Sequence, residues 1–374
     1  MSGPLAGLRV VEFGGIGPGP FCAMMLADMG ADVIRLDRKA DKGKDRGEPA
    51  FLASGRRSVL HRGRRSVAVD LKSAQDRDKV LAMIDGADAV IEGYRPGVLE
   101  RLGLGPEQLL VRNPRLVIGR MTGWGQDGPL AQAAGHDINY IALSGALATI
   151  GRKKGGPIAP AAMVGDLGGG GMMLAFGIVC ALLEARRSGL GQVVDAAVLD
   201  GAALLTSIVC ELRGVGHWKD ERESNLLDGG SHFYDTYECA DGEWISIGAL
   251  EPQFYALLLD KLGITEPEFQ RQRDPAAWPA LKARMVAIFR SQSSAYWCSL
   301  FEATDVCFAP VLSTGDAARH PHNLARETFF ESEGVVQPSP APRFSRTPAG
   351  RPDPAPFIGE HDGAACWLET HVVR

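Results

Sequence analysis

The chain of 374 residues predicts an α/β fold, with a doubly wound parallel sheet and a smaller α+β domain after it. Over about the first 200 residues, short β-rich apolar runs alternate with helical segments. Beyond about residue 225 this alternation gives way to a hairpin pattern and then to helices. The composition, 45% hydrophobic and 23% charged, is that of a globular protein, and the length suggests two domains.

The parallel sheet is expected from apolar, β-branched runs that stop at glycine or charged residues. These strands span 8–13, 32–37, 66–71, 88–92, 116–121 and 193–198. Helices are expected between them at 21–29, 73–84, 106–111 and 172–187, and another at 200–213. Ligands of such sheets bind at the carboxyl ends of the strands.

The loop after the first strand holds Gly15, Gly17 and Gly19, which invites a dinucleotide-binding interpretation with Asp37 as the ribose acid. Pro20 occupies the position of the third fingerprint glycine. A tight turn with Pro20 in the first helical turn is the simpler interpretation.

A basic stretch follows the second strand, from Arg38 to Lys72. A solvated loop explains much of it. The functional alternative is a small polyanion, such as the phosphates of a nucleotide or coenzyme, held at the strand ends.

In the second half, Asp241-Gly242 predicts a hairpin between strands at 233–238 and 243–247. Glu251 and Pro252 open a helix, and helical segments continue to about residue 304. The tail from Pro338, rich in Pro, Arg and Ser, predicts extended chain laid on a surface.

The bulk properties exclude several classes of protein. A net charge of −5 and a pI of about 5.9 argue against nucleic acid as a partner. No window approaches the apolar length of a bilayer span, and no secretory signal is visible, so we expect no membrane and a cytoplasmic location. Seven scattered cysteines without a C-x-x-C pair fit a reducing compartment. His320 and His322 flank a proline in what we interpret as an ordinary loop, so no metal site is expected.

His136 and Asp166 are the candidate proton-transfer groups. His136 follows a glycine and precedes Asp137, and Asp166 precedes the run Gly168 to Gly171. We interpret Asp166 as the N-cap of the next helix, whose unpaired N–H groups could stabilise an oxyanion. Two such groups on separate elements suit a reaction that removes a proton on one face and returns it on the other. A hydrogen-bonded loop His and a structural cap are the plain alternatives.

Several segments match a known family in order and nearly from end to end. They resemble the alpha-methylacyl-CoA racemases of the type III CoA-transferase superfamily. The matching segments begin with Glu92-Gly93-Tyr94-Arg95-Pro96-Gly97-Val98, Met121-Thr122-Gly123-Trp124-Gly125-Gln126 and Gly135-His136-Asp137-Ile138-Asn139-Tyr140. They continue with Val164-Gly165-Asp166, Gly191-Gln192-Val193-Val194-Asp195-Ala196-Ala197, Tyr234-Asp235-Thr236-Tyr237-Glu238-Cys239 and Gly248-Ala249-Leu250-Glu251-Pro252-Gln253-Phe254-Tyr255.

This resemblance implies a Rossmann-like large domain (1–205 and 326–374) that binds coenzyme A, a small domain (226–325), and a linker helix region (206–225). It also implies a homodimer with interlocked chains.

The implied activity is the epimerisation of 2-methylacyl-CoA thioesters through an enolate. His136 and Asp166 would be the two bases, with Glu251 supporting His136 from the partner's small domain. No separate cofactor is expected, since coenzyme A is part of the substrate. The implied coenzyme A contacts are Arg38, Val69, Asp70, Leu71, Lys72, Gly93, Tyr94, Arg95, Arg101, Gly135, Asp137, Ile138, Asn139 and Tyr140. An apolar surface would take the acyl chain, with Met121, Met163, Met172 and Met173 as candidates.

One departure from the family is that 39–65 is longer and more basic than expected, which leaves open which of its cations meet phosphates. Three alternative functions stay open. A type III CoA-transferase would use Asp166 as a nucleophile, although transferases of the superfamily carry a non-basic residue, often Tyr, at the position of His136. The others are a CoA-binding protein without turnover, and a dinucleotide dehydrogenase, which Pro20 disfavours.

Overall fold

The computed structural model describes residues 2–39, 55–363 and 367, which form two compact units. Unit 1 comprises residues 1–144, 161–205 and 324–374, and unit 2 comprises 145–160 and 206–323. Segment 145–160, predicted to lie in the large domain, therefore packs with unit 2. The stretch 40–54, with part of the predicted basic region, lies outside the described residues.

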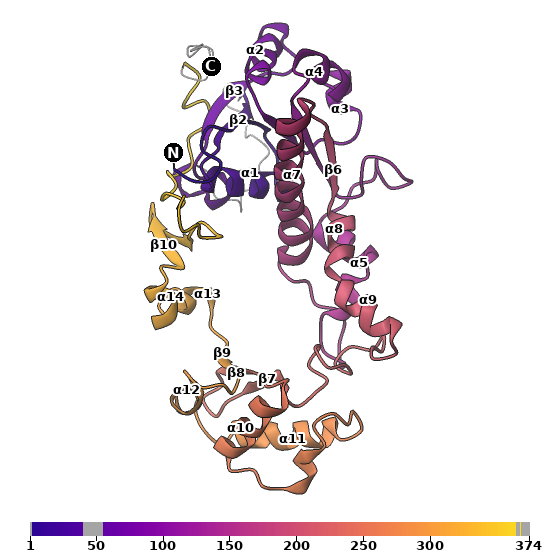
Figure 1. Cartoon of the computed structure of the whole chain (residues 1–374), viewed down its shortest axis with the longest axis vertical. Coiled ribbons are helices and arrows are strands. Elements are labelled where there is room, and N and C mark those ends of the chain that lie inside the picture. Colours follow the sequence, from indigo (N-terminus) through magenta and orange to yellow (C-terminus); the bar gives the residue numbers. More distant parts are fainter. Residues whose placement is uncertain (1, 40–54, 364–366, 368–374) are drawn as a thin grey trace. The chain divides into compact units, whose positions relative to one another are not determined.

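Unit 1 is built on a six-stranded parallel sheet in the order β3-β2-β1-β4-β5-β6, as the alternation predicted (Figure 1). This is the order of doubly wound nucleotide-binding folds, in which the order reverses between β1 and β4. The strands are β1 (Arg9–Phe13), β2 (Asp32–Arg38), β3 (Arg65–Val69), β4 (Ala89–Glu92), β5 (Val117–Thr122) and β6 (Val193–Ala197).

Helices cover both faces of this sheet and bury its apolar side chains in two clusters. One face is covered by α1 (Pro18–Asp28) and α7 (Met173–Ser188), and the other by α2 (Ala74–Asp85), α3 (Val98–Arg101) and α4 (Pro106–Arg112). Unit 1 also contains η1 (Gly55–Arg57), η2 (Val59–His61), α5 (Asp137–Leu143), η3 (Met163–Met172), α8 (Val198–Leu205) and the hairpin β10 (Phe329–Ser332) and β11 (Val335–Pro338).

The C-terminal tail lies along the edge strand β3, as its composition predicted. Ala68 donates its N–H to the Asp362 carboxylate (2.7 Å), and Ser66 accepts from the N–H of His361 (3.0 Å). This contact covers an edge that would otherwise expose unpaired backbone groups.

The expectation that no segment reaches the apolar length of a bilayer span is wrong. Because η3 continues directly into α7, the helix Met163–Ser188 has 26 residues and a mean hydropathy of 1.7, enough to cross a membrane by length and composition. In this chain 44% of that window is buried, and α7 packs on β5 and β6. Core helices pass the same length test.

Unit 2 packs helices on a three-stranded antiparallel sheet, β7-β8-β9. The predicted hairpin is β7 (Tyr234–Glu238) and β8 (Trp244–Gly248), and β9 is Phe308–Pro310. The helix predicted at 200–213 is two helices, α8 in unit 1 and α9 (Ser207–Gly214) in unit 2. The remaining helices of unit 2 are α6 (Ala146–Thr149), α10 (Pro252–Leu262), η4 (Pro267–Gln270), α11 (Trp278–Phe289), α12 (Ser294–Phe301) and α13 (Thr314–Ala317). Helix α14 (Pro321–Ala325) crosses the unit boundary.

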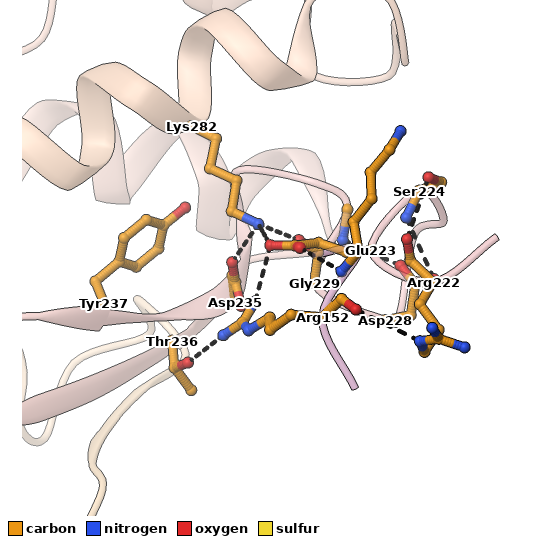
Figure 2. Close-up of polar contacts among 12 residues, drawn as sticks. Arg152, Arg222, Glu223, Ser224, Asp228, Gly229, Asp235, Thr236, Tyr237 and Lys282 are labelled. Carbon is orange, nitrogen blue, oxygen red and sulfur yellow. Dashed lines mark hydrogen bonds and ion pairs between the residues drawn. The ribbon is translucent and has the colours of Figure 1, made fainter. Parts of the chain in front are cut away.

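A cluster of opposite charges holds segment 145–160 to the rest of unit 2 (Figure 2). Arg152 contacts Asp235 (2.7 Å) and Glu223 (3.3 Å), and Lys282 contacts the same two carboxylates (2.6 and 2.8 Å). The side chain of Asp235 is only 4% exposed, so each cation in the cluster depends on a nearly buried anion.

Asp235→Ala is expected to destabilise unit 2 by about 2–4 kcal/mol, because Arg152 and Lys282 lose a buried counter-charge. The matched control is Glu221→Ala, which removes a solvent-exposed pair with Lys153 and should cost much less. Urea denaturation measures both, and equal losses in the two variants would contradict a structural role for the cluster.

Candidate active site and coenzyme cavity

Asp166 lies where three elements of unit 1 meet. It stands in the first turn of η3, a π-helix, and not at the N-cap as predicted, because that position belongs to Ala162. Its backbone N–H donates to the Asp137 carboxylate (2.8 Å) and is not free for an oxyanion. A Cβ on Gly165 would lie 2.2 Å from Oδ1 of Asp137, so glycine is required for this contact.

The carboxyl of Asp166 also lies against the turn between β1 and α1. Gly17, with φ of 71°, supports this turn, and a Cβ there would come within 2.9 Å of Oδ2 of Asp166. Burial, with the Asp137 charge second, raises the pKa of Asp166 to about 6, while His136 acts to lower it. This places Asp166, Asp137 and His136 in one electrostatic site.

His136 is the exposed N-cap residue of α5. Its backbone N–H donates to the Asn139 side chain (3.0 Å), which fixes the entry to the helix. Tyr140 donates its hydroxyl to the carbonyl of Gly135 and packs edge-on against Trp124, with ring centroids 4.7 Å apart. These two contacts hold the loop that presents His136, a role that the sequence did not reveal for Tyr140.

The pKa of Tyr140 indicates which charges surround this residue. It is raised mainly by burial and also by Asp166, and it is lowered by Arg95. Arg95 therefore lies in the same electrostatic neighbourhood as Tyr140 and Asp166.

A separate cavity of about 930 Å³ opens at the carboxyl ends of β1, β2 and β3, where doubly wound sheets bind ligands. Of the predicted coenzyme contacts, six line this cavity: Arg38, Val69, Asp70, Leu71, Lys72 and Tyr94. Gly93 immediately precedes Tyr94. Gly135 lies just before the N-cap of α5, and the helix itself contains Asp137, Ile138, Asn139 and Tyr140. The guanidinium of Arg101 lies beside Gly97.

Most of the described cations of the basic stretch form ion pairs with carboxylates of unit 1. Arg62 pairs with Asp28 (2.6 Å), Arg64 with Glu12 (2.9 Å) and Arg65 with Asp32 (2.5 Å). Arg56 and Lys39 pair with Glu360 and Asp76. Among the described residues of this stretch, the side chains of Arg38, Arg57 and Lys72 pair with no carboxylate, and of these Arg38 and Lys72 line the cavity, where they can meet phosphates.

Asp37 is not available as a ribose acid. Its Oδ2 accepts from Arg35 Nε (2.9 Å) and from the Ser66 hydroxyl. The dinucleotide interpretation therefore lacks its acid as well as its third glycine.

Glu251 is an exposed residue at the N-cap of α10 in unit 2, as predicted from the proline that follows it. Together with burial, its charge raises the pKa of Cys307. Support of His136 by Glu251 stays a prediction.

The methionine candidates divide by burial. Met163 and Met172, at the two ends of the helix that carries Asp166, are 62% and 47% exposed. Met121 is in the core of unit 1, at 3% exposure, so it does not offer an acyl-binding surface.

The comparisons with known proteins agree with this architecture. The chain belongs to CoA-transferase family III, whose model matches residues 5–362. Within that family it is similar to alpha-methylacyl-CoA racemase of Mus musculus, with 46% identity over 96% of this chain and 91% of the relative. The racemase of Homo sapiens is 43% identical over the same shares of each chain. A crystal structure of a CAIB/BAIF family protein from Brucella suis superposes with a TM-score of 0.82 at 27% identity, covering 97% of this chain and 98% of that one.

Replacing Asp166 by Asn is expected to stabilise the protein. A carboxyl whose folded pKa is raised resists ionisation, so the native state carries a penalty that is complete above about pH 6 and absent below about pH 4. The gain should be roughly 1–2 kcal/mol at pH 8, reduced by the partial exposure of the group. Calorimetric Tm values at pH 8 and pH 4 measure it, with the exposed Asp127→Asn as control. A lower Tm for the Asp166 variant at pH 8 would contradict the claim that the ionised carboxyl destabilises the folded protein.

Proposed function

We propose that this protein interconverts the two epimers of 2-methylacyl-CoA thioesters by proton transfer at the α-carbon. The observation that carries the proposal is the pairing of Asp166, whose pKa is raised to about 6, with a histidine in the same electrostatic site. The similarity to the racemases of mouse and human supports the substrate class.

In the proposed reaction one base removes the α-proton and the thioester becomes an enolate. The other base, on the opposite face, returns a proton to the α-carbon, and the product is a mixture of epimers. A general base works best when its pKa lies near the operating pH. Raising the pKa of the Asp166 carboxyl from 3.8 to about 6 brings it toward that range.

The coenzyme would hold the thioester in place. Arg38 and Lys72 are the cations available for its phosphates in the cavity at the strand ends, and Arg95 lies near the catalytic pair. Exposed Met163 and Met172 offer an adaptable apolar surface for the acyl chain beside Asp166.

We also propose that two copies of the chain associate, with Glu251 of one copy supporting His136 of the other. The outer face of α7 supports association, because Phe176, Val179 and Leu183 are 68%, 40% and 70% exposed. Sedimentation velocity should give the mass of two chains, and a monomer would contradict this arrangement.

Incubation of a single (R)-2-methylacyl-CoA in D2O, without an acceptor acid, is expected to give both epimers with deuterium at the α-carbon. Chiral chromatography with mass spectrometry measures both changes. The alternative, a CoA-transferase with Asp166 as nucleophile, predicts unchanged substrate until a carboxylic acid is added, and then acyl transfer. A protein that only binds coenzyme A predicts unchanged substrate in both conditions.

His136→Ala and Asp166→Ala are each expected to lose nearly all epimerisation, because each removes one of the two bases. His136→Ala should still exchange the α-proton of one epimer with solvent, through Asp166. That exchange should fall about tenfold per pH unit below a pKa at or slightly above 6, since the histidine that lowers the Asp166 pKa is gone. Full epimerisation in either variant would exclude the two-base scheme.

A further inference from the structure

The coenzyme cavity of unit 1 contains a histidine that the proposed reaction does not use. His61, the last residue of η2, lines the cavity with Arg35, Arg38 and Lys72. The sequence placed it only within a basic stretch, and its ring makes no hydrogen bond to any residue that the structure describes.

Some of the other polar side chains around the cavity are paired within the protein, and others have no partner among the described residues. Asp37 is held by Arg35 and Ser66, and Lys39 Nζ is paired with Asp76. Arg38 and Lys72 remain as unpaired cations among the described residues. The cavity therefore offers two unpaired positive charges and one free imidazole, beside the Asp70 carboxylate, which accepts from the Lys72 N–H (3.0 Å).

The surroundings of His61 keep this imidazole neutral. Burial lowers its pKa most, and the guanidinium groups of Arg35 and Arg64 lower it further, to about 2. These cations are fixed in place, because Arg35 is paired with Asp37 and Arg64 with Glu12, and all four side chains are buried. A neutral imidazole has one N–H donor and one acceptor nitrogen.

The chemistry of the available groups differs in a way that matches the two parts of a nucleotide. Guanidinium and ammonium groups suit phosphate oxygens. A neutral imidazole can form one hydrogen bond with the edge of adenine, either donating to a ring nitrogen or accepting from the amino group.

We propose that His61 reads the edge of the adenine of coenzyme A, while Arg38 and Lys72 hold its phosphates. The identity of the ligand rests on the proposed function, whereas the role of His61 rests on the cavity. His61 is then a residue that determines specificity for the nucleotide base.

The test is calorimetric binding of coenzyme A itself, of 1,N6-etheno-coenzyme A, whose adenine edge is blocked, and of 3′-dephospho-coenzyme A. The wild-type protein should bind coenzyme A about 3–10-fold more tightly than the etheno analogue, the equivalent of one hydrogen bond. His61→Leu should lower affinity for coenzyme A by the same factor and bind the two equally. His61→Asn, which keeps a donor and an acceptor, should restore part of the discrimination.

Lys72→Ala is the matched control in the same cavity. It should weaken both coenzyme A and the etheno analogue equally and reduce the preference over the dephospho form. Circular dichroism and Tm show whether each variant is folded.

The proposal is overturned if His61→Leu still binds coenzyme A more tightly than the etheno analogue. It is also overturned if His61→Leu loses affinity only for ligands that carry the 3′-phosphate. If the wild-type protein binds no coenzyme A, the proposed function fails together with this role. If the wild-type protein binds coenzyme A tightly and His61→Leu binds it equally well, only the role of His61 is overturned.

Discussion

The close approach of backbones around η3 is the constraint on which the candidate site depends. Gly169 contacts Gly201 and Ala202 so closely that a Cβ on Gly201 would lie 1.8 Å from the Gly169 carbonyl oxygen, and a Cβ on Gly171 would lie 2.7 Å from that of Pro18. Side chains at these positions would hold η3 away from α1 and α8. With hydrogen atoms there instead, the helix sits deep enough for the N–H of Asp166 to meet Asp137. The glycine run is therefore a packing surface and not a flexible turn.

This packing determines the electrostatics of the Asp166 carboxyl. Asp166 is partly removed from water and faces a second carboxylate that is fixed by its own hydrogen bond, so its ionisation is opposed from two sides. The same arrangement that suits a base working near neutral pH costs folding free energy, as strained functional groups generally do. Asp137, adjacent in sequence to His136, acts on the other candidate base: it accepts from the N–H of Asp166 and raises the pKa of its carboxyl.

The local sequence pattern predicted the strands and helices well. It failed where contacts with residues distant in the sequence determine the structure. The six strands of the sheet stand within about two residues of their predicted bounds, since apolar β-branched runs and their terminators are local signals. The N-cap assignment of Asp166 failed because it assumed α-helical geometry, whereas the buried glycines accommodate a wider π-helix. The basic stretch was interpreted as a phosphate site in part, but its arginines pair with Asp28, Glu12 and Asp32, which lie 33 to 52 positions away in sequence. Segment 145–160 was misplaced for the same reason, because the carboxylate partners of Arg152 come 71 and 83 residues later.

The turn between β1 and α1 connects the two halves of the site in unit 1. Gly14, Gly15 and Ile16 line the coenzyme cavity, and the next residue, Gly17, lies against the carboxyl of Asp166. A ligand that fills the cavity therefore touches the same short segment that supports Asp166. In the proposed reaction, binding energy from the nucleotide part of the substrate would hold the thioester at a fixed distance from Asp166. The proposed proton-transfer groups can then remain open to solvent, as His136 is, because the coenzyme and not a closed pocket would orient the reacting carbon.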